Sequence, residues 1–321
     1  MPRIARLSIP GALHHVMARG IEGRSLFTEK EDREYFLSLL SQGLTRSNFK
    51  CYAWVLMDNH YHLLLRLNER PLSELMRPLN SKYAQWFRKK SKTTGYVFQN
   101  RFKSIVTQDQ GYIERLIRYI HLNPIRAGIC KTISELDRYP WSGHAVIIGN
   151  RQNTFQDTKA VLKRFGSDHQ SAVHSYRAYI LTGAGNDEDR DFIGFLKQVN
   201  KGKNDRKVPH CWVIGDQEFV KKALDTDHAR RIQIAEYTRR GITIEKIALA
   251  VATQMEVEAQ AIFKRGRRND RSMFRKMVAA LGHRQYQIPV IEIARYLGVG
   301  SSSISRMLDE GERLAIENKI S

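Results

Sequence analysis

Two hydrophobic periods alternate along the first 145 or so residues. Four segments have the aromatic, β-branched or alternating pattern of strands: His14–Arg19, Phe49–Met57, His60–Leu67 and Val97–Thr107. Three segments place apolar residues at helical spacing: Glu29–Ser47, Pro71–Lys90 and Asp109–Asn123. Asp58–Asn59 predicts a tight hairpin turn. Pro124 predicts the end of the last helix, because the residue before a proline disfavours the helical conformation.

This order of elements predicts an α+β fold, with a ferredoxin-like antiparallel sheet and one added helix, over residues 1–145. Residues 146–225 form a mostly helical connector, with helices at Thr158–Phe165 and Ser171–Leu181 and loops at 183–189 and 201–207. Residues 226–321 form a second domain that is all-α. The chain shows no internal repeat.

The charge of the chain narrows its partners. It holds 53 Lys and Arg residues against 33 Asp and Glu, a formal net charge of +20, and both halves carry a basic excess. A chain this basic attracts polyanions. Nucleic acid is therefore the expected partner, and an acidic membrane surface is the second possibility.

Cysteine usage and hydropathy bear on the compartment. Cys51, Cys130 and Cys211 lie far apart and show no C-x-x-C spacing, which argues against a disulfide framework and a cysteine-ligated zinc site. A reducing cytosol fits this usage best. No stretch approaches the ~20 apolar residues that cross a bilayer. We expect a soluble, cytoplasmic protein that uses no membrane.

Candidate chemistry first emerges on the third predicted strand. Residues two apart on a strand point to the same side, so His60 and His62 project together. Tyr61, Leu63 and Leu65 take the opposite, apolar side and must pack on a core. Two imidazoles on the side away from that core can bind one metal ion, although a histidine pair at this spacing is more often structural.

A second candidate pair lies on the last predicted helix. Tyr119 and Asn123 are four residues apart, so they are neighbours at the rim of the helix's buried stripe. A phenol oxygen and an amide oxygen could reach the same ion. The plainer interpretation is a half-buried tyrosine beside an Asn-Pro helix stop.

Taken together, the two segments resemble the HUH single-strand transposases. The combination of histidine-hydrophobic-histidine with a later Y-x-x-x-N-P is closest to the single-tyrosine branch that includes the REP-associated tyrosine transposases. The resemblance covers residues 3–145. It includes IPGALHHVMARG, YAWVLMDNHYHLLLR, VFQNRFKS and YIHLNPIRAG.

The resemblance implies specific roles for these residues. His60, His62 and Asn123 would bind a divalent metal, Mg²⁺ or Mn²⁺, and Tyr119 would be the nucleophile. A hard cation neutralises the phosphate oxygens, and the covalent step conserves the bond energy for rejoining. The product would be a 5′-phosphotyrosine and a free 3′-hydroxyl on single-stranded DNA that contains a hairpin. No phosphate-binding G-x-x-x-x-G-K-[ST] loop is present.

Several nearby residues compete for these roles. Tyr112 has Leu116 four residues on, which cannot ligate a metal, so Tyr119 is the better nucleophile. Tyr61 points away from the histidine face. His121 lies about 200° round the helix from Tyr119, and we expect it not to be a ligand. His14 and His15 are expected to be surface histidines, with DNA contact as an alternative.

The region before the last helix also offers DNA contacts. The helix 71–90 interleaves basic residues with Tyr83, Trp86 and Phe87, a pattern that suits single strands, although these aromatics are better explained as core residues. Arg101 and Lys103 share one side of a strand near the predicted site. Either could hold a phosphate.

The C-terminal domain contains a helix-turn-helix pattern over residues 288–308. Ala294 is small where two helices would cross, Gly298 suits the turn, and Ile304 would anchor the second helix. Serines and an arginine would then face a duplex groove or its phosphates: Ser301, Ser302, Ser303, Ser305 and Arg306. The cluster KRGRRNDR at 264–271 adds charge. A plain helical interaction domain is the alternative, and single-tyrosine relatives often lack this extension.

Two functions remain after these observations. The first is a transposase, a metal-dependent single-strand DNA endonuclease and strand transferase acting in DNA recombination. The second is a catalytically silent DNA-binding regulator on the same fold. The intact set of His60, His62, Tyr119 and Asn123 favours the enzyme. The sequence leaves the target DNA, the metal used and the oligomeric state open.

Overall fold

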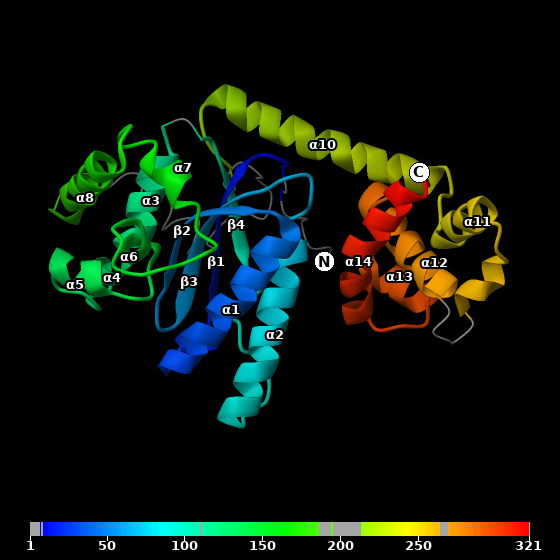
Figure 1. The fold of residues 1–321 in the computed structure, drawn as a ribbon, viewed down its shortest axis with the longest axis horizontal. Coiled ribbons are helices and arrows are strands. Elements are labelled where there is room, and N and C mark those ends of the chain that lie inside the picture. Colours follow the sequence, from blue (N-terminus) through cyan, green and yellow to red (C-terminus); the bar gives the residue numbers. More distant parts are fainter. Residues whose placement is uncertain are drawn as a thin grey trace. The chain divides into compact units, whose positions relative to one another are not determined.

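The computed structural model describes residues 7, 9–109, 111–185, 194, 213–263 and 269–320. The chain divides into two compact units, Met1–Asp225 and Thr226–Ser321 (Figure 1). The first unit contains strands β1 (Leu13–Arg19), β2 (Lys50–Leu56), β3 (His60–Arg66), β4 (Lys103–Thr107) and β5 (Val213–Ile214). Its helices are α1 (Lys30–Ser47), α2 (Ser73–Ser91), α3 (Ile113–His121), α4 (Asn123–Arg126), α5 (Ile133–Arg138), α6 (Gly143–Ile147), α7 (Thr158–Leu162) and α8 (His169–Gly185).

The sheet of the first unit has the strand order β2-β3-β1-β4-β5. The first four strands are antiparallel neighbours, and with α1 and α2 they give the β-α-β-β-α-β order of a ferredoxin-like unit. The predicted antiparallel sheet of residues 1–145 is confirmed, and β5, from beyond that region, adds a fifth strand that pairs with β4 in parallel. The chain returns to β4 only after the long helical segment that follows it, as a parallel neighbour requires.

Element boundaries differ from the sequence prediction, most clearly before β4 and around Pro124. The strand predicted at Val97–Thr107 is regular only over β4, and the residues before it make a single bridge between Gly20 and Phe98. The helix before Pro124 ends already at His121, and Pro124 stands in the first turn of α4. A proline is tolerated there because the first-turn N–H groups have no partner within the helix.

The region predicted as a connector packs onto the first unit. Buried residues of α7 and α8, including Val161, Leu162 and Tyr176, belong to the same apolar cluster as α3. The predicted loop at 183–189 is helical as far as residue 185, where α8 ends, and its remainder lies outside the described residues. The predicted loop at 201–207 also lies outside them.

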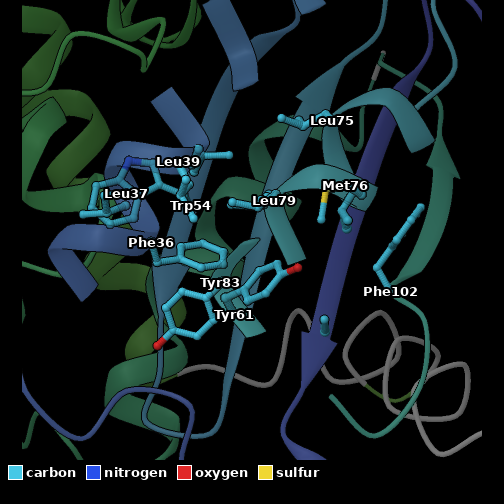
Figure 2. Packing of buried hydrophobic residues seen from close by; sticks show 14 of the residues in the cluster. Phe36, Leu37, Leu39, Trp54, Tyr61, Leu75, Met76, Leu79, Tyr83 and Phe102 are labelled. Carbon is cyan, nitrogen blue, oxygen red and sulfur yellow. The ribbon is translucent and has the colours of Figure 1, made fainter. Parts of the chain in front are cut away.

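One face of the sheet is covered by α1 and α2, which lie side by side in Figure 1. Its cluster contains the alternate strand residues Tyr61, Leu63 and Leu65, as predicted. Figure 2 shows the rings of Phe36, Tyr61 and Tyr83 packed together, with the centroids of Phe36 and Tyr61 4.7 Å apart. This face is therefore an apolar core that contains a group of packed aromatic rings.

Gly43 of α1 lies against the Leu75 side chain of α2. A Cβ on this glycine would come within 2.4 Å of the Leu75 side chain. The start of α1 is fixed by Asp32, whose carboxylate accepts the backbone N–H groups of Thr28 and Glu29 and pairs with Lys90 of α2. The two helices thus form one layer.

The opposite face of the sheet is covered by α3 and the helices that follow it, on the side away from α1 and α2 (Figure 1). Leu64 and Ile105 of the strands and Leu116 and Ile120 of α3 are fully buried there. The sheet therefore lies between two cores, and the histidine-bearing face is not an open surface.

The second unit is helical, with α11 (Ile244–Gln254), α12 (Asn269–Ala280), α13 (Val290–Tyr296) and α14 (Ser301–Glu317), and with short η elements at Ala259–Phe263 and Leu281–Gln285. Helix α10 (Gln217–Arg239) runs across the boundary between the units. Gly298, between α13 and α14, has a φ of +62°, which glycine adopts readily. Ala294 and Ile304 are buried in this unit's core.

Candidate active site

The two histidines of β3 lie on the face covered by α3. His62 is 3% exposed and His60 is half-buried. Their ring centroids are 5.1 Å apart, and the rings are nearly perpendicular. The strand alternation therefore brings the two imidazoles together, as the sequence pattern predicts.

Neighbouring side chains hold the Nδ1 atoms of both histidines. His60 Nδ1 lies 2.7 Å from Asn59 Oδ1, and Asn59 Nδ2 donates to the Gly23 carbonyl, which fixes the amide orientation. His62 Nδ1 lies 2.9 Å from Nε2 of His15 on β1. Among the described residues, neither Nε2 of His60 nor that of His62 has a hydrogen-bond partner.

Both imidazoles are held in the neutral form that can ligate a metal. Burial lowers the pKa of His60 to about 4, with the Arg19 charge adding to the effect and Asp58 opposing it. Burial also holds the pKa of His62 well below its ordinary value, reinforced by His60 and His15. Neutral imidazole nitrogen is the form that binds metals.

Tyr119 of α3 faces this histidine cluster. Its ring centroid is 5.8 Å from that of His62 and 5.8 Å from that of His15, in edge-on contacts. The side chain is 6% exposed, and burial raises the pKa of the phenol, although the charge of Arg126 opposes the shift. The structure therefore brings the Tyr119 ring against His62, one of the predicted metal ligands.

Arg126 and Asn123 anchor the end of α3 beside Tyr119. The Arg126 guanidinium lies 5.2 Å from the centre of the Tyr119 ring and donates to the Tyr119 carbonyl. Asn123 Nδ2 donates to the same carbonyl at 2.7 Å. Since the nitrogen of the Asn123 amide faces the helix backbone, its oxygen is the atom that remains for a ligand.

Cationic residues share the histidine face of the sheet. In the strand register Arg19 stands opposite His60, while Met17 stands opposite both His62 and Lys103. Lys103 is half-buried, and burial lowers the pKa of its ammonium. Arg101, just before β4, is exposed. The histidine pair is therefore bordered by positive charge.

The competing residues take other positions. Tyr61 is fully buried in the α1/α2 cluster, where its hydroxyl donates to Asn80. Tyr112 precedes the first residue of α3 and is only half-buried. His121 points into a separate polar cluster, with Nδ1 2.7 Å from the Tyr176 hydroxyl. The aromatic residues Tyr83 and Phe87 are buried, which confirms that they are core residues.

The prediction that His14 and His15 are surface residues is wrong, because both are fully buried. They stand on β1, the central strand between β3 and β4, so each is covered by one of the two layers. His14 Nδ1 pairs with Ser104 Oγ at 2.9 Å. Burial lowers the pKa of His14 to about 4 and that of His15 to about 3.

Sequence reasoning missed three residues of this site: His15, Arg19 and Arg126. The motif HHVMAR gave a signal for the first two, because His15 and Arg19 are an even number of residues apart and so share a face. Their pairing with β3 depends on the strand register, which the pattern alone does not give.

The candidate residues of the second unit lie in the first two turns of α14. Arg306 of α14 is exposed and donates to Ser303 Oγ. Ser302 lies in the first turn of the same helix, but its side chain falls outside the described part, as do residues 264–268 of the basic cluster. These positions place Ser303 and Arg306 on one helix turn.

Two features of the described residues bear on function. Within the described ranges, no group of three His, Cys, Asp or Glu side chains is placed to hold a metal. Over the same residues, no helix has the length and apolar character of a membrane span.

Comparison with known proteins identifies the family of the N-terminal segment. Residues 9–123 match the family described as "Transposase IS200 like". This segment is therefore an IS200-like transposase domain, and transposases are DNA-processing enzymes. The match contains β1 to α3 and includes His60, His62, Tyr119 and Asn123.

The chain is similar to a solved structure of a REP-associated tyrosine transposase bound to a REP hairpin. It is 18% identical, with a TM-score of 0.40, and the match covers 49% of this chain and 94% of the other. No curated protein matches the chain.

Proposed function

We propose that the chain is a metal-dependent single-strand DNA endonuclease and strand transferase with Tyr119 as its nucleophile. The observation that carries this proposal is the contact of the Tyr119 ring with His62 and His15, on the face where His60 and His62 meet. A nucleophile and two metal-competent imidazoles then share one site within an IS200-like transposase domain.

The residues present fit a divalent cation such as Mg²⁺ or Mn²⁺. Asn59 Oδ1 can only accept a hydrogen bond, so His60 carries its proton on Nδ1. Its Nε2 is therefore unprotonated, and its lone pair can bind a metal. We assign His60 Nε2, His62 Nε2 and Asn123 Oδ1 as the ligands. Once bound, the cation would neutralise phosphate charge and orient the scissile group.

Tyr119 supplies the covalent chemistry in this proposal. The phenol loses its proton, its oxygen bonds to phosphorus, and the 3′ oxygen leaves, which yields a 5′-phosphotyrosine and a free 3′-hydroxyl. Attack by a 3′-hydroxyl on the same phosphorus reverses the step and rejoins a strand. Arg126 stabilises the negative charge on the phenol oxygen, because its guanidinium lies against the ring.

The cationic residues at the site would hold the DNA backbone. Lys103 lies on the histidine face, and Arg101 is exposed immediately before the same strand. Both would bind phosphates of a single strand, which we expect to carry a hairpin. Salt would weaken that binding, since neutralised phosphates release counterions.

The second unit would add duplex recognition. Helices α13 and α14, joined through Gly298, have the helix-turn-helix order, and α14 would enter the groove of a hairpin stem. Ser302, Ser303 and Arg306 in its first turns are the proposed contacts. We place the whole activity in the cytoplasm, where Cys51 and Cys130 remain free thiols.

Covalent capture tests the proposed function. The full chain is mixed with labelled single-stranded hairpin oligonucleotides, with Mg²⁺ or with EDTA, and resolved on a denaturing gel. We expect a metal-dependent protein–DNA adduct in the wild type and in Tyr112→Phe, and none in Tyr119→Phe. An adduct that persists in Tyr119→Phe refutes the nucleophile. Salt-sensitive binding without any adduct, across several hairpins, favours the silent DNA-binding regulator.

A further inference from the structure

His15 is a buried histidine that contacts the proposed site but is neither a proposed metal ligand nor the nucleophile. It stands on β1 with no exposed surface. Its ring stacks on that of His62, with centroids 5.1 Å apart and planes 25° apart. The contact is directed, because His15 Nε2 lies 2.9 Å from His62 Nδ1.

This hydrogen bond joins two nitrogens that cannot both donate in the neutral rings. If His15 Nε2–H donates, His62 is left with its proton on Nε2, and that nitrogen cannot ligate a metal. If His62 Nδ1–H donates to His15 Nε2, the lone pair of His62 Nε2 is free. The direction of one hydrogen bond therefore decides whether His62 is able to bind a metal.

The neighbouring histidine shows the same arrangement with a simpler partner. His60 Nδ1 faces Asn59 Oδ1, an oxygen that can only accept a hydrogen bond, so Nε2 of His60 carries no proton. His60 and His62 are thus both held at Nδ1 by a side chain of the sheet or its hairpin. Metal-binding histidines commonly donate their second ring N–H to such a partner, which fixes the tautomer and the ring orientation.

We infer that His15 is a positioning residue for the proposed metal site, and that its Nε2 accepts the Nδ1–H of His62. This inference rests on the proposed function. It carries a specific consequence for His15 itself, whose proton must then lie on Nδ1. That atom is buried and has no hydrogen-bond partner among the described residues.

The first test measures Mn²⁺ affinity by the electron paramagnetic resonance signal of free Mn²⁺, without DNA. His15→Phe keeps the ring and removes the acceptor, and we expect Mn²⁺ binding to weaken roughly 10- to 100-fold. His15→Gln restores an acceptor oxygen, and we expect most of the affinity to return. His14→Phe is the matched control, because His14 is equally buried on the same strand but pairs with Ser104, and its affinity should not change.

The second test observes the tautomers directly. In ¹⁵N spectra of the Mg²⁺-loaded wild type, we expect the proton of His15 on Nδ1 and that of His62 on Nδ1. A His15 proton on Nε2 in the loaded protein overturns the inference. This measurement needs no variant, so it decides the question even where His15→Phe fails to fold.

The outcomes separate this inference from the proposed function. Wild-type affinity in a folded His15→Phe overturns the role of His15 and leaves the metal site standing. Equal losses in His15→Phe and His14→Phe also overturn it, because general destabilisation of β1 would explain both. A wild type that binds no Mn²⁺ removes the metal site and His15's role together, whereas the nucleophile is judged separately by covalent capture.

Discussion

The two faces of the one sheet are built from alternate residues of the same strands, yet they differ in chemistry. The face under α1 and α2 carries Tyr61, Leu63 and Leu65 in an apolar cluster. The face under α3 carries His60 and His62 beside Tyr119. The period of two thus gives β3 a wholly apolar face on one side and, on the other, two histidines beside the buried Leu64.

The largest expected effect comes from the apolar face. Phe36→Ala removes a fully buried ring, and we expect it to lower the free energy of unfolding by roughly 3–5 kcal/mol. His60→Ala, on the half-buried edge of the other face, should cost about 1 kcal/mol or less. Urea denaturation of both variants measures the contrast. Similar losses of unfolding free energy in the two variants would show that His60 stabilises the core, contrary to its proposed role as a metal ligand.

The next largest expected loss of stability comes from the buried polar cluster beside α3. The Tyr176 hydroxyl bridges Nδ1 of His121 and Nδ1 of His144, both fully buried. Tyr176→Phe leaves these nitrogens unpaired, and we expect a total loss of roughly 1–3 kcal/mol. Tyr61→Phe, which gives up one bond to half-buried Asn80, is the control and should lose less in the same denaturation experiment. Equal losses of unfolding free energy in the two variants would show that the Tyr176 bridge does not stabilise the packing of α3.

Acid should weaken the fold through the buried histidines. The folded pKa of His14 is about 4, below the ordinary 6.5. The unfolded chain therefore binds more protons between these values, so stability falls as pH drops through this window. We expect His14 alone to account for about 2 kcal/mol between pH 7 and pH 5. Melting curves of wild type and His14→Phe across this range measure it, and identical pH slopes would contradict the assignment.

The smallest effect concerns Arg126. Arg126→Lys weakens the contact with the Tyr119 ring and the bond to its carbonyl, and we expect about 1 kcal/mol, or roughly a fivefold slower covalent adduct formation. The rate is measured at saturating oligonucleotide. Arg118→Lys on the same helix, whose guanidinium lies over Tyr179 instead, should leave the rate unchanged. A slower rate in both variants would point to the helix rather than to Arg126.

The sequence was sufficient for the features that depend on local period. The strand of His60 and His62, the helix of Tyr119 and the antiparallel core of four strands all follow from spacing. Features that depend on the register between distant segments did not follow. The contact of His15 with His62 spans 47 residues, and the pairing of β5 with β4 spans more than 100, so no local pattern encodes either.

The elements that cover the histidine face could not be predicted from local sequence patterns either. Residues 146–225 were predicted to be a mostly helical connector, with two helical segments and two loops. In the structure, Leu162, Tyr176 and Ile180 complete the cluster under α3. The likeness of one segment to a transposase domain therefore did not reveal what closes that domain.

The outer edges of β2 and β4, the two outer strands of the antiparallel core, are partly covered by pairing with other segments. β5 pairs with the outer side of β4, while Gln156 and Ser142 bridge to Cys51 and Val55 of β2. An unpaired strand edge can template the addition of a strand from another molecule, which leads to aggregation. The segments that follow the transposase domain thus act as edge protection, and a chain cut back to residue 123 would expose both edges and should self-associate.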